Sequence, residues 1–219
     1  LAELAAKAPP KPPTGIFRLP IDRVFTIKGF GTVATGTAIS GSIRVGDAVM
    51  IYPPGYKARV RGLQVHSASV EEALAGNRTA VNLQGLEKEE LERGMVVAPG
   101  GALISSRRLD AYLEILESAP RALKHRQAVR FHTGTSERVG MPLLLDAEEL
   151  VPGASGYVQF FLREPLALKP GDRFVIRSFS PAFTWGGGII LHVNPPRHKR
   201  RQAAVLEGLK VLEQGSPED

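Results

Sequence analysis

Short runs of β-branched and aromatic residues, bounded by glycine, proline or aspartate, recur along most of the chain. The alternation is clearest in KARVRGLQVH, where Ala58, Val60 and Gly62 share one face of a strand and Lys57, Arg59 and Arg61 share the other. A period of two residues is typical of a half-buried β-strand. Comparable runs are IFRLPI, RVFTIK, TVATGTAI, SIRVGDAVMIY and RTAVNLQ before residue 100, and RRLDAYLEIL, HRQAVRFHT, GYVQFFLR, DRFVIRSF and GIILHV after it.

Strands that recur roughly every 8–12 residues with glycine turns between them favour closed barrels, because closure leaves no strand edge free to aggregate. We predict an all-β fold of two small antiparallel β-barrels, residues 15–102 and residues 103–195, with short helical termini. Two helical turns are expected within the first barrel. One would begin at Ser69 and end at Gly76, and the other would lie within residues 87–94.

The two ends of the chain have the composition of connecting segments. Residues 1–14 join a stretch of good helix formers to the proline-rich PPKPPTG, and we expect a linker from a preceding domain. Residues 196–219 carry the basic run RHKRR and then Val205, Leu209 and Leu212 at helical spacing. We expect a basic linker and a short helix there, with the apolar stripe packed on a part of the protein outside this sequence.

The composition narrows the class of function. The chain has no cysteine, which excludes disulfides, thiolate zinc sites and a cysteine nucleophile. Five scattered histidines leave little for a metal cluster, so no metal site is predicted. No apolar run approaches the roughly 20 residues of a membrane helix, and we expect no membrane partner. The net charge of +6 and the isoelectric point of about 9.8 favour a polyanionic partner.

The glycine-rich stretch GFGTVATGT resembles a phosphate-binding loop only in spacing. Gly31 and Gly36 are five residues apart, but Thr37 follows where the loop needs lysine, and no helix-forming sequence comes next. We expect these glycines to fit closely crossing strands instead. No nucleophile or nucleotide-binding set is recognisable elsewhere, so we predict no catalytic residues in this chain.

Several arginines remain to be explained. Arg23 follows Asp22 between two strand runs, and Arg78 lies at the start of another. Taken alone, each favours a surface ion pair or a solvated face, which contributes little to stability. Lys57, Arg59 and Arg61 could form a solvated barrel face or an RNA contact. The run from residue 197 to residue 201 fits a plain linker and a phosphate contact about equally well.

Long stretches of the sequence resemble a known family. FRLPIDRVFTIKGFGTVATGT, SGSIRVGDAVMIYP, RVRGLQVH and AGNRTAVNLQGLEKEELERGMVV resemble the second domain of translational GTPases. FHTGTSE, RSFSPAFTWGGGIIL and NPPRHKR resemble the third domain. Among these GTPases, the sequence is most similar to the selenocysteine-specific elongation factors, over about residues 15–201.

The resemblance implies a function and a set of partners. The factor would bind selenocysteyl-tRNA and deliver it to the ribosome for UGA recoding in the cytoplasm. GTP and magnesium would bind a GTPase domain outside this sequence, and a C-terminal domain would bind an mRNA hairpin. The present sequence would then have no enzymatic activity of its own, whereas the intact protein would be a GTPase.

The resemblance also implies two binding sites in the first barrel. Asp22, Arg23 and Arg78 would line the pocket for the selenocysteine side chain, with His66 as a weaker candidate. The 3′ end of the tRNA would be held by Glu90 and Arg93 beside the backbone of Gly85 and Leu86. In the third domain, tRNA stems would contact basic residues, for which the candidates are Arg107, Arg108, Lys124, His125, Arg126 and Arg130.

Two alternatives stay open from the sequence. The barrels could belong to a general translational GTPase that binds aminoacyl- or initiator-tRNA. They could also be a docking module for the ribosome or another protein that recognises no amino acid. A selenocysteine pocket requires Arg23 and Arg78 to converge on a small closed site, whereas the docking alternative predicts two dispersed, solvent-facing arginines.

Overall fold

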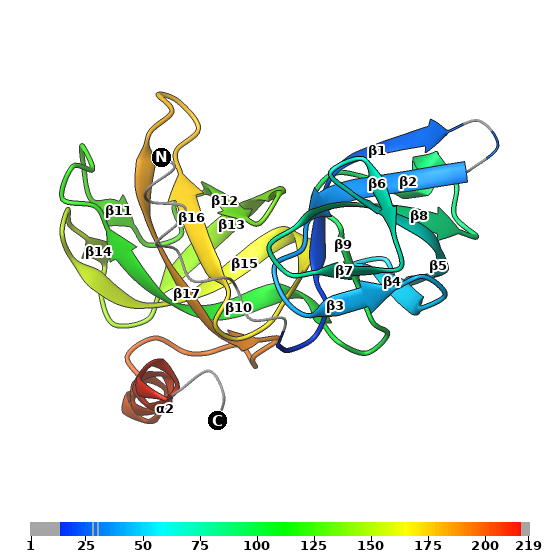
Figure 1. The fold of residues 1–219 in the computed structure, drawn as a ribbon. Helices are drawn as coiled ribbons and strands as arrows, with labels where there is room; N and C mark the ends of the chain where they lie inside the picture. Colours follow the sequence, from blue (N-terminus) through cyan, green and yellow to red (C-terminus); the bar gives the residue numbers. More distant parts are fainter. Residues whose placement is uncertain (1–13, 28, 30, 216–219) are drawn as a thin grey trace, which may run out of the picture. The chain divides into compact units, whose positions relative to one another are not determined.

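The computed structural model describes residues 14–27, 29 and 31–215, and these fold into two compact units that divide after Ala102 (Figure 1). Both units are built of antiparallel strands, and the predicted all-β class is confirmed. The helical stretch and proline-rich linker expected at the N-terminus lie, except for Thr14, outside the described residues.

The first unit is a closed six-stranded barrel with a seventh strand attached. The barrel order is β4-β9-β1-β2-β8-β5, pairing of β4 with β5 closes it, and β6 extends it beyond β5. The short strands β3 and β7 pair separately. The strands are β1 (Leu19–Ile27), β2 (Gly31–Thr37), β3 (Ser42–Arg44), β4 (Ala48–Tyr52), β5 (Tyr56–Val65), β6 (Ala68–Val70), β7 (Glu72–Leu74), β8 (Arg78–Gln84) and β9 (Val96–Ala98).

Alternating side chains fill this barrel, as the sequence pattern predicts. On β8, Thr79, Val81 and Leu83 are buried, while Ala80 and Asn82 between them are partly exposed. The predicted close crossing of strands is confirmed at Gly36, where an added Cβ would lie 2.1 Å from the carbonyl oxygen of Pro20. The absence of a side chain there lets β1 and β2 approach each other. The prediction is wrong for Gly31, where the nearest atom would be 4.0 Å away and φ is +91°.

One of the two predicted helical turns is absent. Ser69 lies in β6 opposite Gln64, and Glu72 lies in β7 opposite Arg44, with 3.2 Å between the two charged groups. The capping pattern was misleading because pairing with distant strands outweighs a local helical preference. The second turn is present as a 3₁₀ helix, η1 (Lys88–Glu90).

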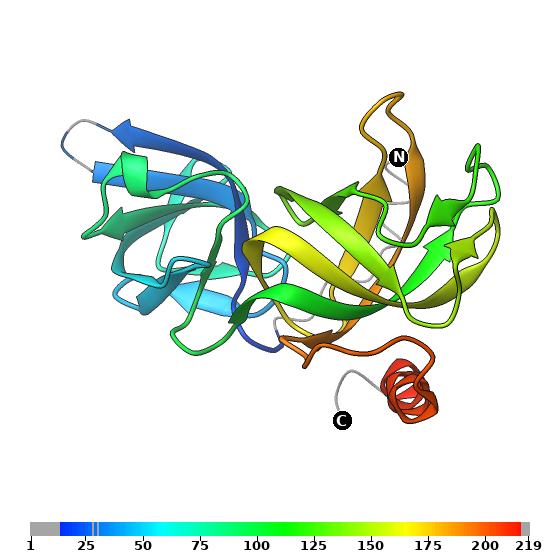
Figure 2. The ribbon, with the colours of Figure 1, turned by 180° about the vertical axis from the view of Figure 1, so that it is seen from behind.

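The second unit is a six-stranded closed barrel in the order β10-β15-β13-β12-β16-β17, with β17 paired back to β10 (Figure 2). Strands β11 and β14 form a separate pair. The elements are β10 (Ile104–Ile115), β11 (Leu123–Lys124), β12 (Val129–Thr133), β13 (Ser136–Leu144), β14 (Glu149–Leu150), β15 (Ser155–Leu168), β16 (Arg173–Arg177), β17 (Thr184–Val193) and the helix α2 (Ala203–Gln214).

Aromatic side chains dominate the core of the second barrel. The rings of Phe131 and Phe174 stack with centroids 4.8 Å apart, and Phe160 meets both edge-on. Trp185 is fully buried beside Phe183, at a centroid distance of 4.7 Å. Ring pairs of this kind stabilise a core beyond the area that they bury.

The C-terminal helix packs on its own barrel. Leu209 is buried with Leu143, Leu145 and Leu191, which lie in or directly after strands of the second unit. The expectation that the apolar stripe packs outside this sequence is therefore wrong for Val205 and Leu209, whereas Leu212 is 50% exposed. Leu143 and Leu145 face outward from the barrel core and form an apolar patch that the helix covers.

Candidate functional site

A bidentate ion pair spans three strands of the first barrel. Arg78 of β8 donates from Nη1 to Asp22 Oδ2 at 2.5 Å and from Nη2 to Asp22 Oδ1 at 3.1 Å. Thr35, on the intervening strand β2, donates its hydroxyl to the same Oδ1 at 2.8 Å. An irregularity in the register of β1 between Ile21 and Arg23 inserts Asp22 at this point. Such a bulge redirects a side chain, and here the carboxylate reaches across β2.

The pair is charged and partly open to water. Burial raises the pKa of Asp22, but the hydrogen bonds from Arg78 and Thr35 outweigh it and bring the pKa below its usual value. The side chain of Arg78 is 53% exposed and that of Asp22 is 21% exposed. The arrangement is therefore a formed ion pair at the surface of this unit. Arg23 is exposed as well, so within the described residues the two arginines do not form the small closed site that a selenocysteine pocket requires.

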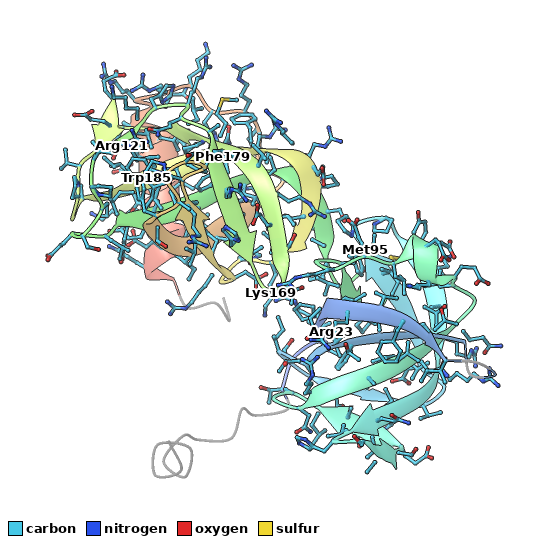
Figure 3. The ribbon with its side chains drawn as sticks, turned by 90° about the horizontal axis from the view of Figure 1, so that it is seen from above. Arg23, Met95, Arg121, Lys169, Phe179 and Trp185 are labelled. Carbon is cyan, nitrogen blue, oxygen red and sulfur yellow. The ribbon has the colours of Figure 1, made fainter. Side chains whose placement is uncertain are left out.

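Arg78 has N–H donors that its bonds to Asp22 do not use. A guanidinium has five N–H donors, and the two bonds to Asp22 use two of them, which leaves three for a ligand. Arg23 is exposed at the surface of the same barrel, and its charge also lowers the pKa of Asp22 (Figure 3). Two arginines against one carboxylate leave one net positive charge at the site.

His66 lies at the same end of the sheet. It forms the turn between β5 and β6 with Ser67, and both residues have positive φ, 51° and 67°. Val65 pairs with Thr79, so the turn follows at the register position next to Arg78. The structure therefore places Asp22 of β1, Arg78 of β8 and His66 of the turn after β5 at one end of the first barrel.

The residues predicted to hold the tRNA 3′ end form a structural turn. Gly85 has a φ of +93°, and Leu86 is buried in the core of the first barrel. Glu90 accepts a hydrogen bond from the backbone of Glu87 at 2.8 Å and so caps η1. Arg93 is exposed. The role of these four residues in RNA binding stays a prediction.

Sequence reasoning missed a hollow on the outer face of the first barrel. The hollow has a volume of about 260 Å³. It lies beside the ion pair, because its lining residue Ala80 pairs with Thr35 on β2 and with Gln64, a second lining residue, on β5. Phe25 and Ile27, each 38% exposed, provide its apolar wall. Phe25 and Ile27 follow Arg23 at intervals of two residues, so the three side chains lie on the same face of β1. This spacing is the sequence feature from which the hollow could have been predicted. The other lining residues are Val33, Arg61, Gly62, Leu63, Ser69 and Asn82.

The second barrel carries a cationic and aromatic surface of its own. The guanidinium of Arg130 lies over the ring of Phe179, 5.2 Å from the centroid, and Phe179 is 42% exposed. Arg130 also pairs with Glu137 at 2.8 Å, and Arg177 lies opposite it on β16. Of the predicted basic candidates, Arg130 is thus the one held beside an exposed ring. On the same barrel, the guanidinium of Arg121 lies over the ring of the buried Trp185, 5.6 Å from its centroid (Figure 3).

The other basic candidates of this barrel are placed differently. His125 accepts a hydrogen bond at Nδ1 from the backbone of Leu144 at 3.2 Å, and burial lowers its pKa. This histidine is therefore an uncharged structural residue at neutral pH. Arg107, Lys124 and Arg126 are exposed, and Arg108 is half-buried.

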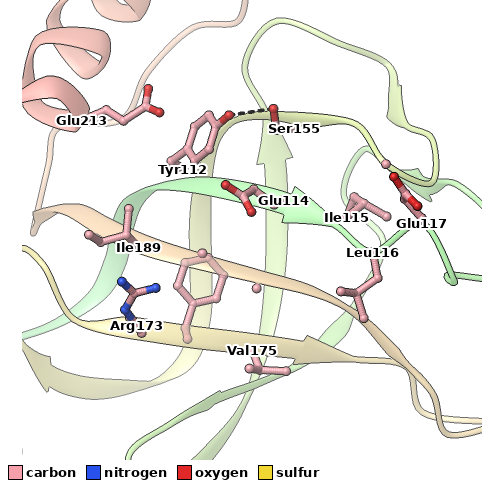
Figure 4. A pocket seen from close by; sticks show the side chains of 14 residues that line it. Tyr112, Glu114, Ile115, Leu116, Glu117, Ser155, Arg173, Val175, Ile189 and Glu213 are labelled. Carbon is pink, nitrogen blue, oxygen red and sulfur yellow. Dashed lines mark hydrogen bonds between the residues drawn. The ribbon is translucent and has the colours of Figure 1, made fainter. Parts of the chain in front are cut away.

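A large trough on the second barrel is acidic (Figure 4). Its volume is about 770 Å³, and Glu114, Glu117 and Glu213 line it against a single cation, Arg173. The hydroxyl of Tyr112 donates to Ser155 at 2.7 Å along one wall. Three carboxylates would repel a phosphate backbone, so this face does not suit RNA.

Two negative observations concern the described residues. No group of three or more histidine, aspartate or glutamate side chains gathers there in a way that could hold a metal ion. Within the same residues, no helix is long and apolar enough to cross a membrane.

Comparisons with known proteins agree with this arrangement. Residues 31–98 match elongation factor Tu domain 2, and residues 110–197 match the β-barrel domain of selenocysteine-specific elongation factor. A selenocysteine-specific elongation factor from Desulfomicrobium baculatum is 46% identical over 213 residues, which cover 97% of this chain and 33% of that protein. The factor from Haemophilus influenzae is 33% identical over 220 residues, covering 99% of this chain and 34% of that protein.

A solved structure gives the same result. The crystal structure of a bacterial selenocysteine-specific elongation factor superposes with a TM-score of 0.83 at 27% identity, covering 97% of this chain and 34% of that one. The present chain spans about a third of the length of the curated relatives that it matches. With two consecutive domain matches and relatives aligned over almost its whole length, the chain belongs to the selenocysteine-specific elongation factor family.

Proposed function

We propose that this chain is the pair of tRNA-binding barrels of a longer factor that delivers selenocysteyl-tRNA to the ribosome in the cytoplasm. GTP and magnesium bind, in this proposal, to a separate GTPase domain, and a further C-terminal domain binds the mRNA hairpin. The observation that carries the proposal is the Arg78 guanidinium, which Asp22 fixes in place while three of its N–H donors remain for a ligand.

The chemistry of the amino acid suits this arrangement. A selenol is more acidic than a thiol, so selenocysteine is largely an anion at neutral pH, whereas serine, its precursor on the same tRNA, is neutral. Arginine is permanently charged and presents a rigid fork of donors. Asp22 would orient the fork, and Arg23 would supply the net positive charge that a selenolate requires. A serine hydroxyl would leave that charge uncompensated.

The hollow beside the ion pair supports a place for the last nucleoside of the tRNA. It combines an apolar wall from Phe25 and Ile27 with polar side chains such as Gln64, a mixture suited to a flat base. The ester that joins the amino acid to the tRNA keeps the two within a few bonds. A base in the hollow would therefore hold the selenocysteine near Arg78. Gly85, Leu86, Glu90 and Arg93 remain the alternative position for the 3′ end.

Protection of the aminoacyl ester tests the proposed function. The longer protein with GTP is mixed with selenocysteyl-tRNA or seryl-tRNA on the same tRNA body, and spontaneous deacylation is followed. We expect protection of the selenocysteyl form only. Equal protection of both forms would indicate a general aminoacyl-tRNA carrier, and protection of neither would favour the docking module.

The second barrel gives a separate prediction about tRNA affinity. We expect Phe179→Ala to weaken tRNA binding by the same factor at every salt concentration, because contact between an uncharged ring and the tRNA releases no counterions. Arg130→Ala should instead lower the slope of log affinity against log salt by about one, since it removes one cationic contact to phosphate.

The measurement is a salt titration of tRNA binding, with Val175→Ala as the control. Val175 is equally exposed, at 42%, but lies in the acidic trough. A loss of affinity in Val175→Ala equal to that in Phe179→Ala would contradict the assignment of the RNA-binding face.

A further inference from the structure

The segment between β17 and α2 is bound tightly to the second barrel. We call residues 194–202 the strap. At its start, Asn194 donates its backbone N–H to the carbonyl of Arg108 at 3.0 Å and has a φ of +60°. Further along, the carbonyl of Pro196 accepts a hydrogen bond from Gln159 at 2.9 Å. The strap therefore follows the barrel surface from its first residue.

Two buried polar residues of the barrel depend on this strap. Asp110 of β10 is 1% exposed, and Gln159, opposite it on β15, is fully buried. Gln159 donates to Asp110 Oδ1 at 2.8 Å and accepts from the backbone N–H of His198 at 3.2 Å. The ring Nε2 of His198 lies 2.7 Å from Asp110 Oδ2. We call Asp110, Gln159 and His198 the latch.

Removing the strap would leave the latch unsatisfied. Burial raises the pKa of Asp110, and the hydrogen bonds from His198 and Gln159 act against that rise. Without the strap, a buried carboxylate would lose one of its two partners, and Gln159 would lose both of its backbone partners. A buried polar group without a partner is costly, so the latch favours the closed position of the strap.

A second anchor follows immediately. Arg200 donates from Nε to the carbonyl of Leu144 at 3.0 Å and from Nη2 to that of Ala147 at 2.6 Å. Glu148 pairs with both Arg200 and Arg201 at 2.9 Å. Arg201 has a φ of +57°, a conformation that a non-glycine residue keeps only when its surroundings enforce it. The burial of Leu209 then fixes α2.

We propose that the strap and α2 form a rigid arm of the second barrel, fastened by the latch, rather than a flexible linker. Any polypeptide joined to the end of α2 then takes its direction from the barrel. Of the basic run, Arg200 and Arg201 serve this anchoring, while Arg197 and Lys199 are exposed. The proposed arm would be rigid whether or not the first barrel binds tRNA at the site proposed above.

Spin labels at two engineered cysteines test the arm directly, because the chain has no cysteine of its own. Arg163→Cys on β15 and Lys210→Cys on α2 are both exposed. We expect a narrow distance distribution between the labels. His198→Ala should broaden it and should speed amide hydrogen exchange in the strap about tenfold or more, the factor for one lost hydrogen bond to a charged group.

Two further variants make the test specific. His198→Gln keeps a side-chain N–H donor and should restore most of the narrow distribution. His192→Ala is the control, since His192 is an exposed histidine opposite Asp110 on β17 and lies outside the latch. An unchanged distribution and unchanged exchange in His198→Ala would overturn the proposal. Equal acceleration of exchange throughout the barrel would also overturn it, because the latch would then be a core element.

Discussion

Replacing Arg78 by alanine in the longer protein should lower the preference for selenocysteyl-tRNA over seryl-tRNA by about 10- to 100-fold. The expected size corresponds to one charge-assisted hydrogen bond of about 1.5–3 kcal/mol. Seryl-tRNA, which makes no ionic contact and is not expected to be protected, should deacylate at the same rate with the variant as with the unaltered protein. The loss therefore appears as a change in selectivity rather than in overall tRNA affinity.

The measurement is the rate of spontaneous deacylation of the two aminoacyl-tRNAs in the presence of each variant and GTP. Arg44→Ala is the matched control, because Arg44 also forms an ion pair with a carboxylate on the first barrel, at 3.2 Å from Glu72. An equal loss of protection for both tRNAs, or the same effect from Arg44→Ala, would contradict a role for Arg78 in recognising the side chain.

The ion pair itself adds no pH dependence near neutrality. The pKa of Asp22 lies below the ordinary value of 3.8, so the carboxylate stays ionised and its stabilising contribution is fully present above that value. The contribution is lost only as the pH falls through the lowered pKa. A change in selectivity between pH 5 and pH 8 would therefore not come from this carboxylate.

The sequence predicts the barrels well because their information is local. Alternation along RTAVNLQ assigns each side chain to the core or to solvent without any knowledge of the partner strand. In KARVRGLQVH the alternation holds only as far as Val60, because a register shift before Gly62 places Leu63 in the core and Gly62 beside the outer hollow. The same local reasoning fails from Ser69 to Gly76. A capping pattern favours a helix there, whereas pairing with Gln64 and Arg44 decides the structure. Register with distant strands is not visible in a single sequence.

The candidate site could be predicted from the sequence only in part, because it also depends on the register between distant strands. The resemblance to translational GTPases selects Asp22 and Arg78, but only the bulge in β1 explains how their side chains meet across β2. The latch could not be predicted, since Asp110 and His198 are 88 positions apart in the sequence. The partner of α2 was missed because Leu143 and Leu145 become an outward patch only once the barrel has closed.

Gly36→Ala should strongly destabilise the first barrel, by about 2–4 kcal/mol. The added Cβ would lie 2.1 Å from the carbonyl oxygen of Pro20 and 2.9 Å from a methyl carbon of Leu19. A backbone oxygen cannot move aside as the end of a flexible side chain can. Strand β1 must therefore shift away from β2, and the melting temperature should fall by roughly 10 °C or more.

Gly62→Ala is the matched control, because Gly62 lies inside strand β5 with no atom within 4 Å of an added Cβ and no positive φ. Alanine there should leave the melting temperature unchanged or raise it slightly, since it reduces the freedom of the unfolded chain.

Circular dichroism follows the melting of the whole chain, and the fluorescence of Trp185, its single tryptophan, follows the second barrel alone. Gly36→Ala should shift the first signal more than the second. If Gly36→Ala and Gly62→Ala had the same melting temperature, the close approach of β1 and β2 at Gly36 would not determine the structure of this part of the barrel. In that case the position of Asp22, directly after the residue that pairs with Gly36, would need another explanation.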